Sequence, residues 1–201
     1  MRLLIARHGQ TKHNLDHRYQ GITDAPLNQT GLSQSHKLAD RLSNEKIDVI
    51  YSSDLIRCVQ TAESIAKEHG LSINKDERLR EISFGKWEGM SYNEIQAQSP
   101  DLLEKWMADP AHVSPPNGET LIQLAVRVKS IVDEMKTRHT DQTSLIVTHG
   151  GVIRALLCIS LDIDLNRHSQ FESATGSVSE LSFYEESVIL KLFNDISHLQ
   201  K

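Results

Sequence analysis

Short apolar runs separated by polar segments mark the strands of this chain. The runs are rich in aliphatic and β-branched residues, and turn-forming residues bound them. The predicted strands span residues 3–6, 47–51, 72–75 (weak), 144–148, 177–183 and 188–193. The last two are close enough in sequence to form a hairpin.

Apolar residues between these strands recur at helical spacing. One stripe begins behind Thr30, which predicts a helix that Thr30 caps. A second stripe begins at Leu55 and ends near Gly70, and the longest opens at Glu119 or Thr120. Candidate caps for the second helix are Ser52, Ser53 and Asp54.

Strands that alternate with helices of this length predict βαβ units and parallel strand pairing. We therefore expect an α/β fold with three layers, in which helices flank a mainly parallel central sheet. Residues 152–159 are apolar nearly all round, which predicts a buried helix. We expect a single domain over residues 1–201, with a cap-like insertion of short helices and loop around 90–118 and an irregular segment over 10–29.

Composition narrows the function classes. Of 201 residues, 38% are hydrophobic and 24% charged, a balance typical of a folded globular chain. The formal net charge of −5 gives no basic footprint, so we expect neither nucleic acid nor membrane as a partner. Two isolated cysteines, Cys58 and Cys158, and an apolar run before Arg7 that is too short for a signal peptide indicate a cytoplasmic protein.

Arginine and histidine residues follow the predicted parallel strands where each strand ends. Arg7 and His8 follow the first strand, Arg57 lies one turn beyond the second, and His149 follows the third. Because the carboxyl ends of parallel strands meet at one sheet edge, these residues and Glu81 from an intervening loop should converge. Arginines pair with phosphate oxygens, a neutral histidine can attack phosphorus, and a carboxylic acid can protonate the leaving oxygen. Each residue alone is a weak signal, but together they predict phosphoryl chemistry.

The same segments resemble the histidine phosphatase superfamily, which has the phosphoglycerate-mutase-like fold. The resemblance covers residues 4 to 154 in order and spacing. It rests on LIARHGQT (4–11) with Asn14, YQG (19–21), PLNQTG (26–31), YSSDLIR (51–57), QTA (60–62), LREI (79–82), FGKWEG (84–89), PNGET (116–120) and IVTHGGVIR (146–154). These motifs are specific for the superfamily and much less specific for the substrate.

The resemblance implies a role for each residue of the set. His8 is the expected nucleophile, which becomes phosphorylated, and Arg7, Arg57 and His149 are expected to hold the phosphoryl oxygens. Glu81 is the expected general acid for the leaving alkoxide and then the base that activates water.

Further residues are expected to contact the substrate. Asn14 would be an additional donor, Gln20 and Gly21 would lie near the substrate, and Gly150 follows the third strand at a helix start. No metal or other cofactor is implied, because the arginines would supply the charge neutralisation.

Electrostatics are consistent with these roles. Cationic Arg7 and Arg57 disfavour the imidazolium form of His8, which keeps its attacking nitrogen free. A bound phosphate dianion favours the acid form of Glu81. We therefore expect an activity optimum on the acid-to-neutral side.

Three other functions stay open. His13 and His17, with Asp16 between them and His8 nearby, have a spacing that chelates zinc if the segment is helical. A phosphoglycerate mutase would use the same phosphohistidine, although the mutases of the superfamily are generally longer. A non-catalytic relative would bind a phosphorylated ligand without turnover.

The resemblance leaves the substrate undecided. Candidates are α-ribazole 5′-phosphate, phosphoserine, and sugar or glycerate phosphates, so the expected partner is a small phosphorylated metabolite. The metal-independent phosphoserine phosphatases have histidine at the position of Phe84, which weakens that assignment. Phe84, Trp87 and the loop 109–118 are candidates for the leaving-group pocket, and a homodimer stays open because many relatives are dimers.

Overall fold

The computed structural model describes residues 1–200, and its strands form one six-stranded sheet. The strands are β1 (Arg2–Arg7), β2 (Val49–Ser52), β3 (Ile73–Lys75), β4 (Thr143–Thr148), β5 (Val178–Phe183) and β6 (Val188–Asp195). Their order is β3-β2-β4-β1-β5-β6, and the first four are parallel. β5 is antiparallel to β1 and to β6, which confirms the mainly parallel sheet and the terminal hairpin.

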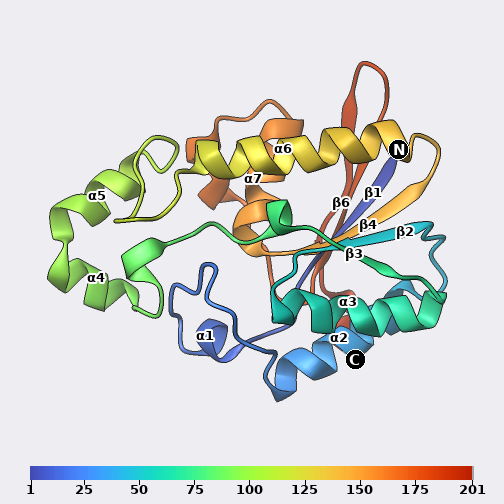
Figure 1. Ribbon diagram of the computed structural model, residues 1–201, viewed down its shortest axis with the longest axis horizontal. Helices are drawn as coiled ribbons and strands as arrows, with labels where there is room; N and C mark the ends of the chain where they lie inside the picture. The colour runs from blue at the N-terminus through green and yellow to red at the C-terminus, as the bar shows by residue number, and fades with distance from the viewer. Residues whose placement is uncertain (201) are drawn as a thin grey trace.

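Helices cover both faces of this sheet. The helices are α1 (Lys12–Leu15), α2 (Gln29–Leu42), α3 (Ile56–His69), α4 (Tyr92–Gln98), α5 (Pro100–Ala108), α6 (Leu121–Arg138) and α7 (Gly150–Ser160). Short 3-10 helices are η1 (Glu77–Leu79), η2 (Gly85–Trp87), η3 (Leu165–Gln170) and η4 (Ser197–Leu199). Figure 1 shows α6 and α7 on one side of the sheet and α2 and α3 on the other, which confirms the three-layer α/β fold.

Successive side chains of β1 pack into the cores on opposite faces of the sheet. Leu3 and Ile5 belong to the core that contains α6 and α7, whereas Leu4 and Ala6 belong to the core that contains α2 and α3. Successive side chains of a strand point to opposite faces, so a run that is apolar at every position needs cover on both. The run over residues 3–6 therefore fixes a central strand with helices above and below.

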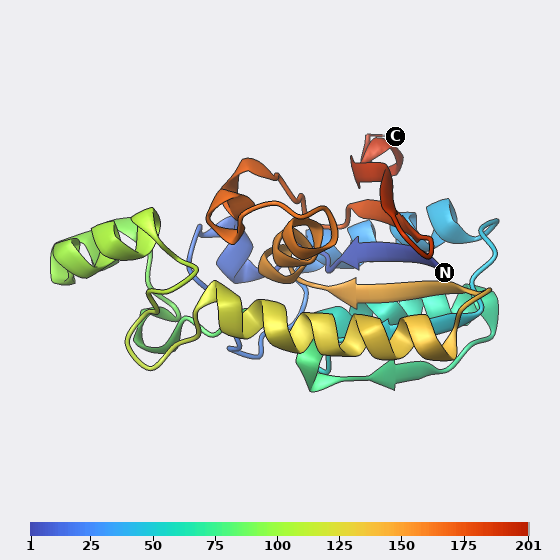
Figure 2. The same cartoon turned by 90° about the horizontal axis from the view of Figure 1, so that it is seen from above.

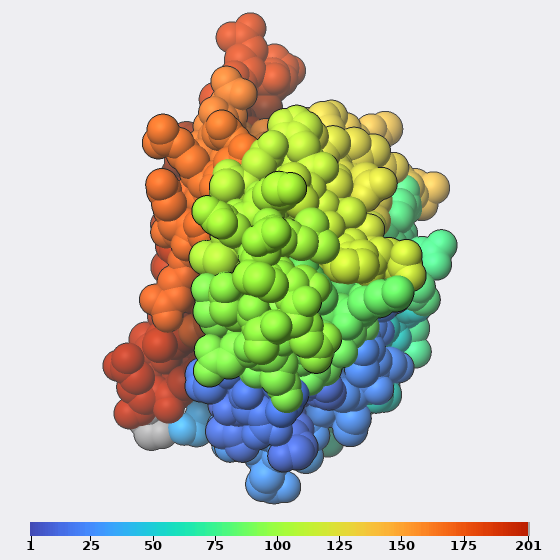
Figure 3. All heavy atoms as spheres, turned by 90° about the vertical axis from the view of Figure 1, so that its left-hand side faces the viewer, coloured from blue at the N-terminus to red at the C-terminus, as the bar shows by residue number. Residues whose placement is uncertain are grey.

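The parallel strands all end toward one end of the molecule. In Figure 2 the arrowheads of β1 (blue) and β4 (orange) point toward the green α4 and α5. Figure 3 looks at the molecule from that end and shows this green segment between the orange segment near η3 and the blue N-terminal segment. Residues that follow β1, β2 and β4 therefore lie on the side of the sheet that α4 and α5 overhang.

The expected cap at Thr30 is wrong, because the cap and the start of α2 lie two residues earlier. Asn28 is the cap, and its Oδ1 accepts from Gly31 N at 2.8 Å. Asn28 is also held from outside the helix, since Asn28 N donates to Gln10 O and Asn28 Nδ2 donates to Gln10 Oε1, each at 2.9 Å. Asparagine caps at least as well as threonine, so this long-range anchoring decides the start.

The expected caps of α3 are also wrong. The capping position is Leu55, which has no polar side chain, and Ile56 N instead donates to Asp24 Oδ1 at 2.8 Å. The predicted caps have other partners: Ser53 Oγ contacts His149 Nε2, and Asp54 pairs with Arg80. Ser53 Oγ also accepts from Leu55 N at 3.4 Å, but neither Ser53 nor Asp54 takes the capping position.

Other boundaries agree with the sequence pattern. Thr120 caps α6 in a capping box with Gln123, and Gly70 ends α3 in the left-handed conformation with φ 63°. The predicted irregular segment ends at residue 28, because Gln29 begins α2, and its only helix is the single turn α1. None of the helices within residues 1–200 combines the length and the apolar character that a membrane crossing requires. Lys201 lies outside the described residues, and the single domain over 1–201 stays a prediction.

The two-sided burial of β1 predicts its contribution to stability. Ile5 is fully buried, so Ile5→Ala should lower the free energy of unfolding by about 2–5 kcal/mol through lost packing and a cavity. Ile189 on β6 is 42% exposed and gives a matched control, because Ile189→Ala removes the same atoms from a strand surface. Urea denaturation measures both, and equal losses in the two variants would contradict the packing described.

Candidate active site

His8 follows directly after β1 and is 3% exposed. Its backbone N–H continues the strand pairing by donating to Thr148 O at 3.0 Å. On its ring, Nδ1 lies 2.7 Å from Gly9 O. A carbonyl oxygen only accepts, so Nδ1 carries the ring proton and Nε2 keeps its lone pair.

His149 follows β4 and lies beside His8, with ring centroids 5.1 Å apart. It is fully buried, and its Nδ1 accepts from Arg57 Nε at 3.2 Å. Its Nε2 therefore carries the proton and donates to Ser53 Oγ at 2.9 Å. Each ring nitrogen of His149 thus has a partner within the protein, which fixes the orientation of the ring.

Both imidazoles are held in the neutral form. Burial, followed by the charges of Arg57 and Arg7, keeps the pKa of His8 well below its usual 6.5. Burial and then Arg57 have the same effect on the pKa of His149, with smaller contributions from His8 and Arg7. The sequence-based expectation of an uncharged His8 beside two arginines agrees with this arrangement.

The two arginines are buried in different ways. Arg57, near the start of α3, is 1% exposed, and its guanidinium also donates to Thr23 O at 2.9 Å and Gly21 O at 2.7 Å. Arg7 Nη1 donates to the Ser173 carbonyl, while Arg7 Nε is buried without a partner. Burial lowers the pKa of Arg7 to about 10, so this side chain stays a cation at neutral pH.

Glu81 lies in the loop after η1 and faces the start of α7. Its Oε2 accepts from Gly151 N at 3.1 Å, and its Oε1 accepts from Ile82 N at 3.0 Å. A Cβ built at Gly151 would overlap Glu81 Oε1, so only glycine lets the carboxylate approach this helix end. A carboxylate at a helix N-terminus is also favoured by the helix dipole.

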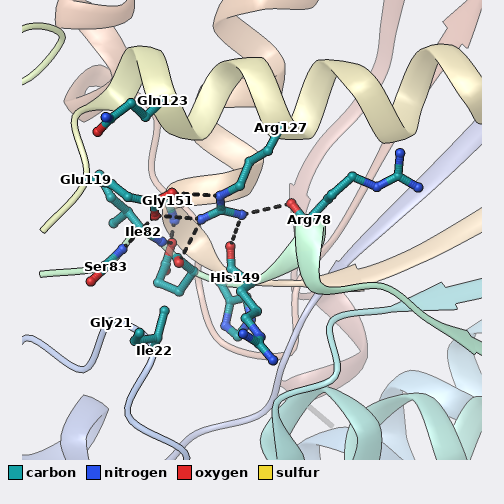
Figure 4. A network of polar contacts seen from close by, with 12 residues as sticks. Gly21, Ile22, Arg78, Ile82, Ser83, Glu119, Gln123, Arg127, His149 and Gly151 are labelled. Atoms are coloured by element: carbon teal, nitrogen blue, oxygen red, sulfur yellow. Dashed lines mark hydrogen bonds and ion pairs between the residues drawn. The ribbon is translucent and has the colours of Figure 1, made fainter.

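Arg127 holds the loop that carries Glu81, and sequence reasoning missed it. From α6 it donates to the backbone carbonyls of Arg78, Arg80 and Glu81 at 2.6–2.9 Å, and it pairs with Glu119 at 2.9 Å (Figure 4). These contacts fix the backbone beneath the Glu81 carboxylate. The available signal was an arginine directly before the buried Val128 in the apolar stripe of α6.

In two of the predicted substrate-contact residues, Asn14 and Gln20, the amide oxygen already has a partner within the protein. Asn14 Oδ1 accepts from Thr11 N and Thr11 Oγ1, both at 3.0 Å, so its amide oxygen caps α1. Gln20 Oε1 accepts from Thr11 Oγ1 at 2.8 Å, and Gln20 Nε2 is buried without a partner. Gly21 adopts φ 55° and accepts from Arg57 through its carbonyl.

Two adjoining hollows lie at this edge of the sheet. The first, the polar hollow, has a volume of about 350 Å³ and is lined by seven predicted residues: Arg7, His8, Asn14, Gln20, Gly21, Arg57 and Glu81. The second, the side hollow, has about 340 Å³ and includes Gly150. The two share Arg7, Tyr19, Glu81 and Phe84. His149 lines neither hollow, since it is fully buried and bonded to Arg57.

Two of the three candidates for the leaving-group pocket line these hollows. Phe84 lines both, and Pro110 from the loop 109–118 lines the side hollow. Trp87 is 3% exposed and packs with Ile95 and Leu103, so it is a core residue. A larger hollow of about 620 Å³ lies at the amino ends of β1 and β4 and contains none of the predicted site residues.

The geometry does not favour the metal-site hypothesis at His13 and His17. Helix α1 ends at Leu15, and His17 has φ 51°, so the two histidines do not share a helix face. Asp16 forms an ion pair with Lys12 at 2.9 Å. Within residues 1–200, no group of three or more histidine, cysteine, aspartate or glutamate side chains is placed to hold a metal ion.

Comparison with known proteins identifies the family. Residues 3–196 match the model of the Histidine phosphatase superfamily (branch 1). Phosphoserine phosphatase 1 from Hydrogenobacter thermophilus is 37% identical over 99% of this chain and 94% of its own. Glucosyl-3-phosphoglycerate phosphatase from Mycolicibacterium vanbaalenii is 34% identical over 82% and 76%. The structure of YhfR from Bacillus stearothermophilus has a TM-score of 0.92 at 32% identity, over 98% of both chains.

The chain therefore belongs to the histidine phosphatase superfamily, as its motifs indicated. Its similarity to proteins named as phosphatases, over 82–99% of the chain, supports a phosphoric monoester hydrolase with a small substrate. The fold also matches its structural neighbours along almost the entire chain.

The neutral histidines predict how stability depends on pH. In the unfolded chain each titrates near 6.5, so below that pH the unfolded state binds more protons than the folded state. Stability is therefore present above pH 6.5 and falls as the pH drops toward 5, by up to about 1.4 kcal/mol per pH unit for each histidine. Urea denaturation between pH 7 and 5 should show a shallower slope for His149→Gln than for the wild type. Exposed His36 gives the control His36→Gln, and an equal slope in all three proteins would contradict the assignment.

Proposed function

We propose that this chain hydrolyses small phosphomonoesters through a phosphohistidine formed on His8. The observation that carries the proposal is the free Nε2 lone pair of His8 at a hollow that two arginines and one carboxylate also line. A neutral nucleophile beside fixed cations suits attack on a phosphate dianion, because the cations reduce the repulsion between the lone pair and the phosphate oxygens.

In the first step, Nε2 of His8 attacks phosphorus and the bond to the ester oxygen breaks. Arg7 and Arg57 would stabilise the charge on the three equatorial oxygens, and Gln20 Nε2, buried and without a partner, is available as another donor. Glu81 in its acid form protonates the departing alkoxide. His149 acts through Arg57 and Ser53, which orient it, so we assign it to positioning and to keeping charge off His8.

In the second step, water attacks the phosphohistidine. Glu81 takes one proton from this water as the new oxygen–phosphorus bond forms and the nitrogen–phosphorus bond breaks. Inorganic phosphate leaves, and His8 returns to its neutral form. No cofactor enters this scheme, since the arginines carry the positive charge.

A mutase and a non-catalytic binder share the first contacts of this scheme but not its outcome. In a mutase an alcohol acceptor takes the phosphoryl group from His8, and a binder does not cleave the ester. A phosphoserine phosphatase that is 37% identical over 99% of this chain favours hydrolysis, although proteins with phosphoglycerate mutase names match the same share of the chain at 28–36% identity. Release of inorganic phosphate from p-nitrophenyl phosphate, with no alcohol acceptor present, is the direct test.

The two cysteines bear on the cellular compartment of the protein. Cys58 and Cys158 are both buried and unpaired, as thiols of a reducing compartment are. We therefore propose that the enzyme acts on small phosphorylated metabolites of the cytoplasm.

Removing the nucleophile should abolish turnover. His8→Ala removes the buried imidazole of the polar hollow. His149 has partners on both ring nitrogens and cannot replace it, and His17, the other histidine in the lining, is an exposed side chain. Phosphate release should fall to the background level, while His36→Ala on the surface of α2 keeps wild-type activity. Substantial phosphatase activity in His8→Ala would refute the mechanism.

Replacing the proton donor Glu81 should affect the phosphorylation of His8 and the hydrolysis of the phosphohistidine differently. Glu81→Gln cannot give or take the proton, so kcat should fall about 10²–10⁴-fold. With p-nitrophenyl phosphate, whose leaving group needs little protonation, the first step should survive and the phosphoenzyme should accumulate. A rapid-mixing experiment would then show a burst of nitrophenol, and intact-mass analysis would show one added phosphoryl group. An unchanged kcat would remove Glu81 from the chemistry.

A further inference from the structure

The side hollow joins the polar hollow at Arg7 and Glu81, the groups that would flank the ester oxygen of a bound substrate. The alcohol half of a substrate whose ester oxygen faces Glu81 can therefore extend into the side hollow. Much of the wall is apolar and comes from separate parts of the chain: Tyr19, Phe84, Trp106, Met107, Pro110 and Leu121. The hollow therefore has room for a small carbon skeleton against aromatic and aliphatic side chains.

Arg154 on α7 is the distinctive polar group of this hollow. It makes no hydrogen bond or ion pair with any residue in the part of the chain that the structure describes, and its Nε is buried without a partner. It lies three and four residues after Gly151 and Gly150, so all three share one helix face. Helical side chains lean toward the N-terminus of their helix, so Arg154 leans toward the end of α7 where Arg7 packs over Gly150 and Glu81 packs over Gly151.

Donors outnumber acceptors around the hollow. Besides Arg154, the buried N–H donors without a partner are Arg7 Nε and Trp106 Nε1. His168 Nδ1 is also unpaired, but burial lowers the pKa of this imidazole, and a nitrogen of a neutral ring can donate or accept. The only carboxylate in the lining is that of Glu81, and both of its oxygens already accept backbone N–H groups. Asn166, the remaining amide, donates to Asp109 and accepts from Ala111 N.

An unpaired guanidinium and unpaired N–H groups in a partly buried hollow are costly unless a ligand supplies acceptors. Arg7 is adjacent to the phosphoryl site, so Arg154 is the cation that remains for a second group. One guanidinium matches one monoanion, and a second phosphate dianion would need more positive charge than the lining offers. A carboxylate satisfies both the charge and the bidentate geometry of arginine.

We propose that Arg154 binds a carboxylate on the alcohol half of the substrate, so that the enzyme prefers phosphate esters of small hydroxy acids. This inference rests on the proposed phosphatase function and specifies its substrate class. The ester oxygen would sit at the junction beside Glu81, the carboxylate in the side hollow at Arg154, and the carbon skeleton against Trp106 and Phe84.

A matched pair of substrates tests the preference. 3-Phosphoglycerate and glycerol 3-phosphate differ in that one carries a carboxylate where the other carries a hydroxymethyl group. In the wild type, kcat/KM should be about 10- to 100-fold higher for the carboxylate ester, the range of one charge-assisted hydrogen-bonded contact. O-phosphoserine and O-phosphoethanolamine differ by the carboxylate alone, and kcat/KM should again be higher for the ester that carries it.

Variants of Arg154 locate the effect. In Arg154→Met the ratio of the two kcat/KM values should fall to within about threefold of unity, and Arg154→Lys should retain part of it. Arg167→Met is the matched control: Arg167 is exposed on η3 near the hollow and does not line it, so the ratio should not change. If the ratio of the two kcat/KM values fell equally in Arg167→Met, the preference would come from the overall positive charge of this region and the proposal would be overturned.

Product inhibition gives a readout that needs no variant. Glycerate should inhibit wild-type hydrolysis of p-nitrophenyl phosphate more strongly than glycerol does. Equal kcat/KM values for the paired esters, a ratio that persists in Arg154→Met, or equal inhibition by the two products would each reject the carboxylate site. Absence of hydrolysis with every ester, p-nitrophenyl phosphate included, would instead reject the phosphatase function itself.

Discussion

The parallel pairing of β1 with β4 is the contact on which the site depends. Its register sets Arg7 opposite Thr148, and the N–H of His8 extends the ladder by one more bond to Thr148 O. Because both strands end together, the next residues along the two strands are His8 and His149, with rings 5.1 Å apart. A shift of one residue would turn one of these side chains to the opposite face of the sheet. The core on both faces of β1, which fixes the register, therefore also fixes the spacing of the two histidines.

Charge at this edge is concentrated and incompletely balanced. Arg57 is buried and bonded to backbone carbonyls and to a neutral imidazole, while Arg7 keeps one nitrogen unpaired. Burying cations among neutral partners is unfavourable, and an incoming phosphate dianion relieves that cost. Burial first, and then the charges of these two arginines, lower the pKa of His8 and leave a lone pair for attack. Substrate binding and activation of the nucleophile thus have one electrostatic origin.

Much of this arrangement could be predicted from the sequence. Apolar runs identified the parallel strands. Because the carboxyl ends of parallel strands share an edge, the sequence also predicts that Arg7, His8, Arg57 and His149 lie close together. Residues that act through long-range contacts could not be found this way. Asp24 at the start of α3 and Arg127 beneath the Glu81 loop contact partners more than thirty residues away.

Local patterns also misled at particular residues. Ser53 and Asp54 look like helix caps, but tertiary partners recruit both. Trp87 looked like a pocket residue, whereas the neighbouring cluster buries it and places Trp106 at the hollow instead. Arg154 lies in an otherwise apolar helix, and only the three-dimensional lining shows that its guanidinium meets no partner there.

The central claim is that phosphate passes through a covalent bond to His8. The stereochemistry at phosphorus tests this claim most directly, because each in-line displacement inverts the configuration. The substrate is a phosphorothioate monoester whose two non-bridging oxygens are different isotopes, and its hydrolysis is carried out in water of the third isotope. The inorganic phosphorothioate released should show overall retention, the sum of two inversions. Overall inversion would show that water attacks the ester directly and would contradict the account.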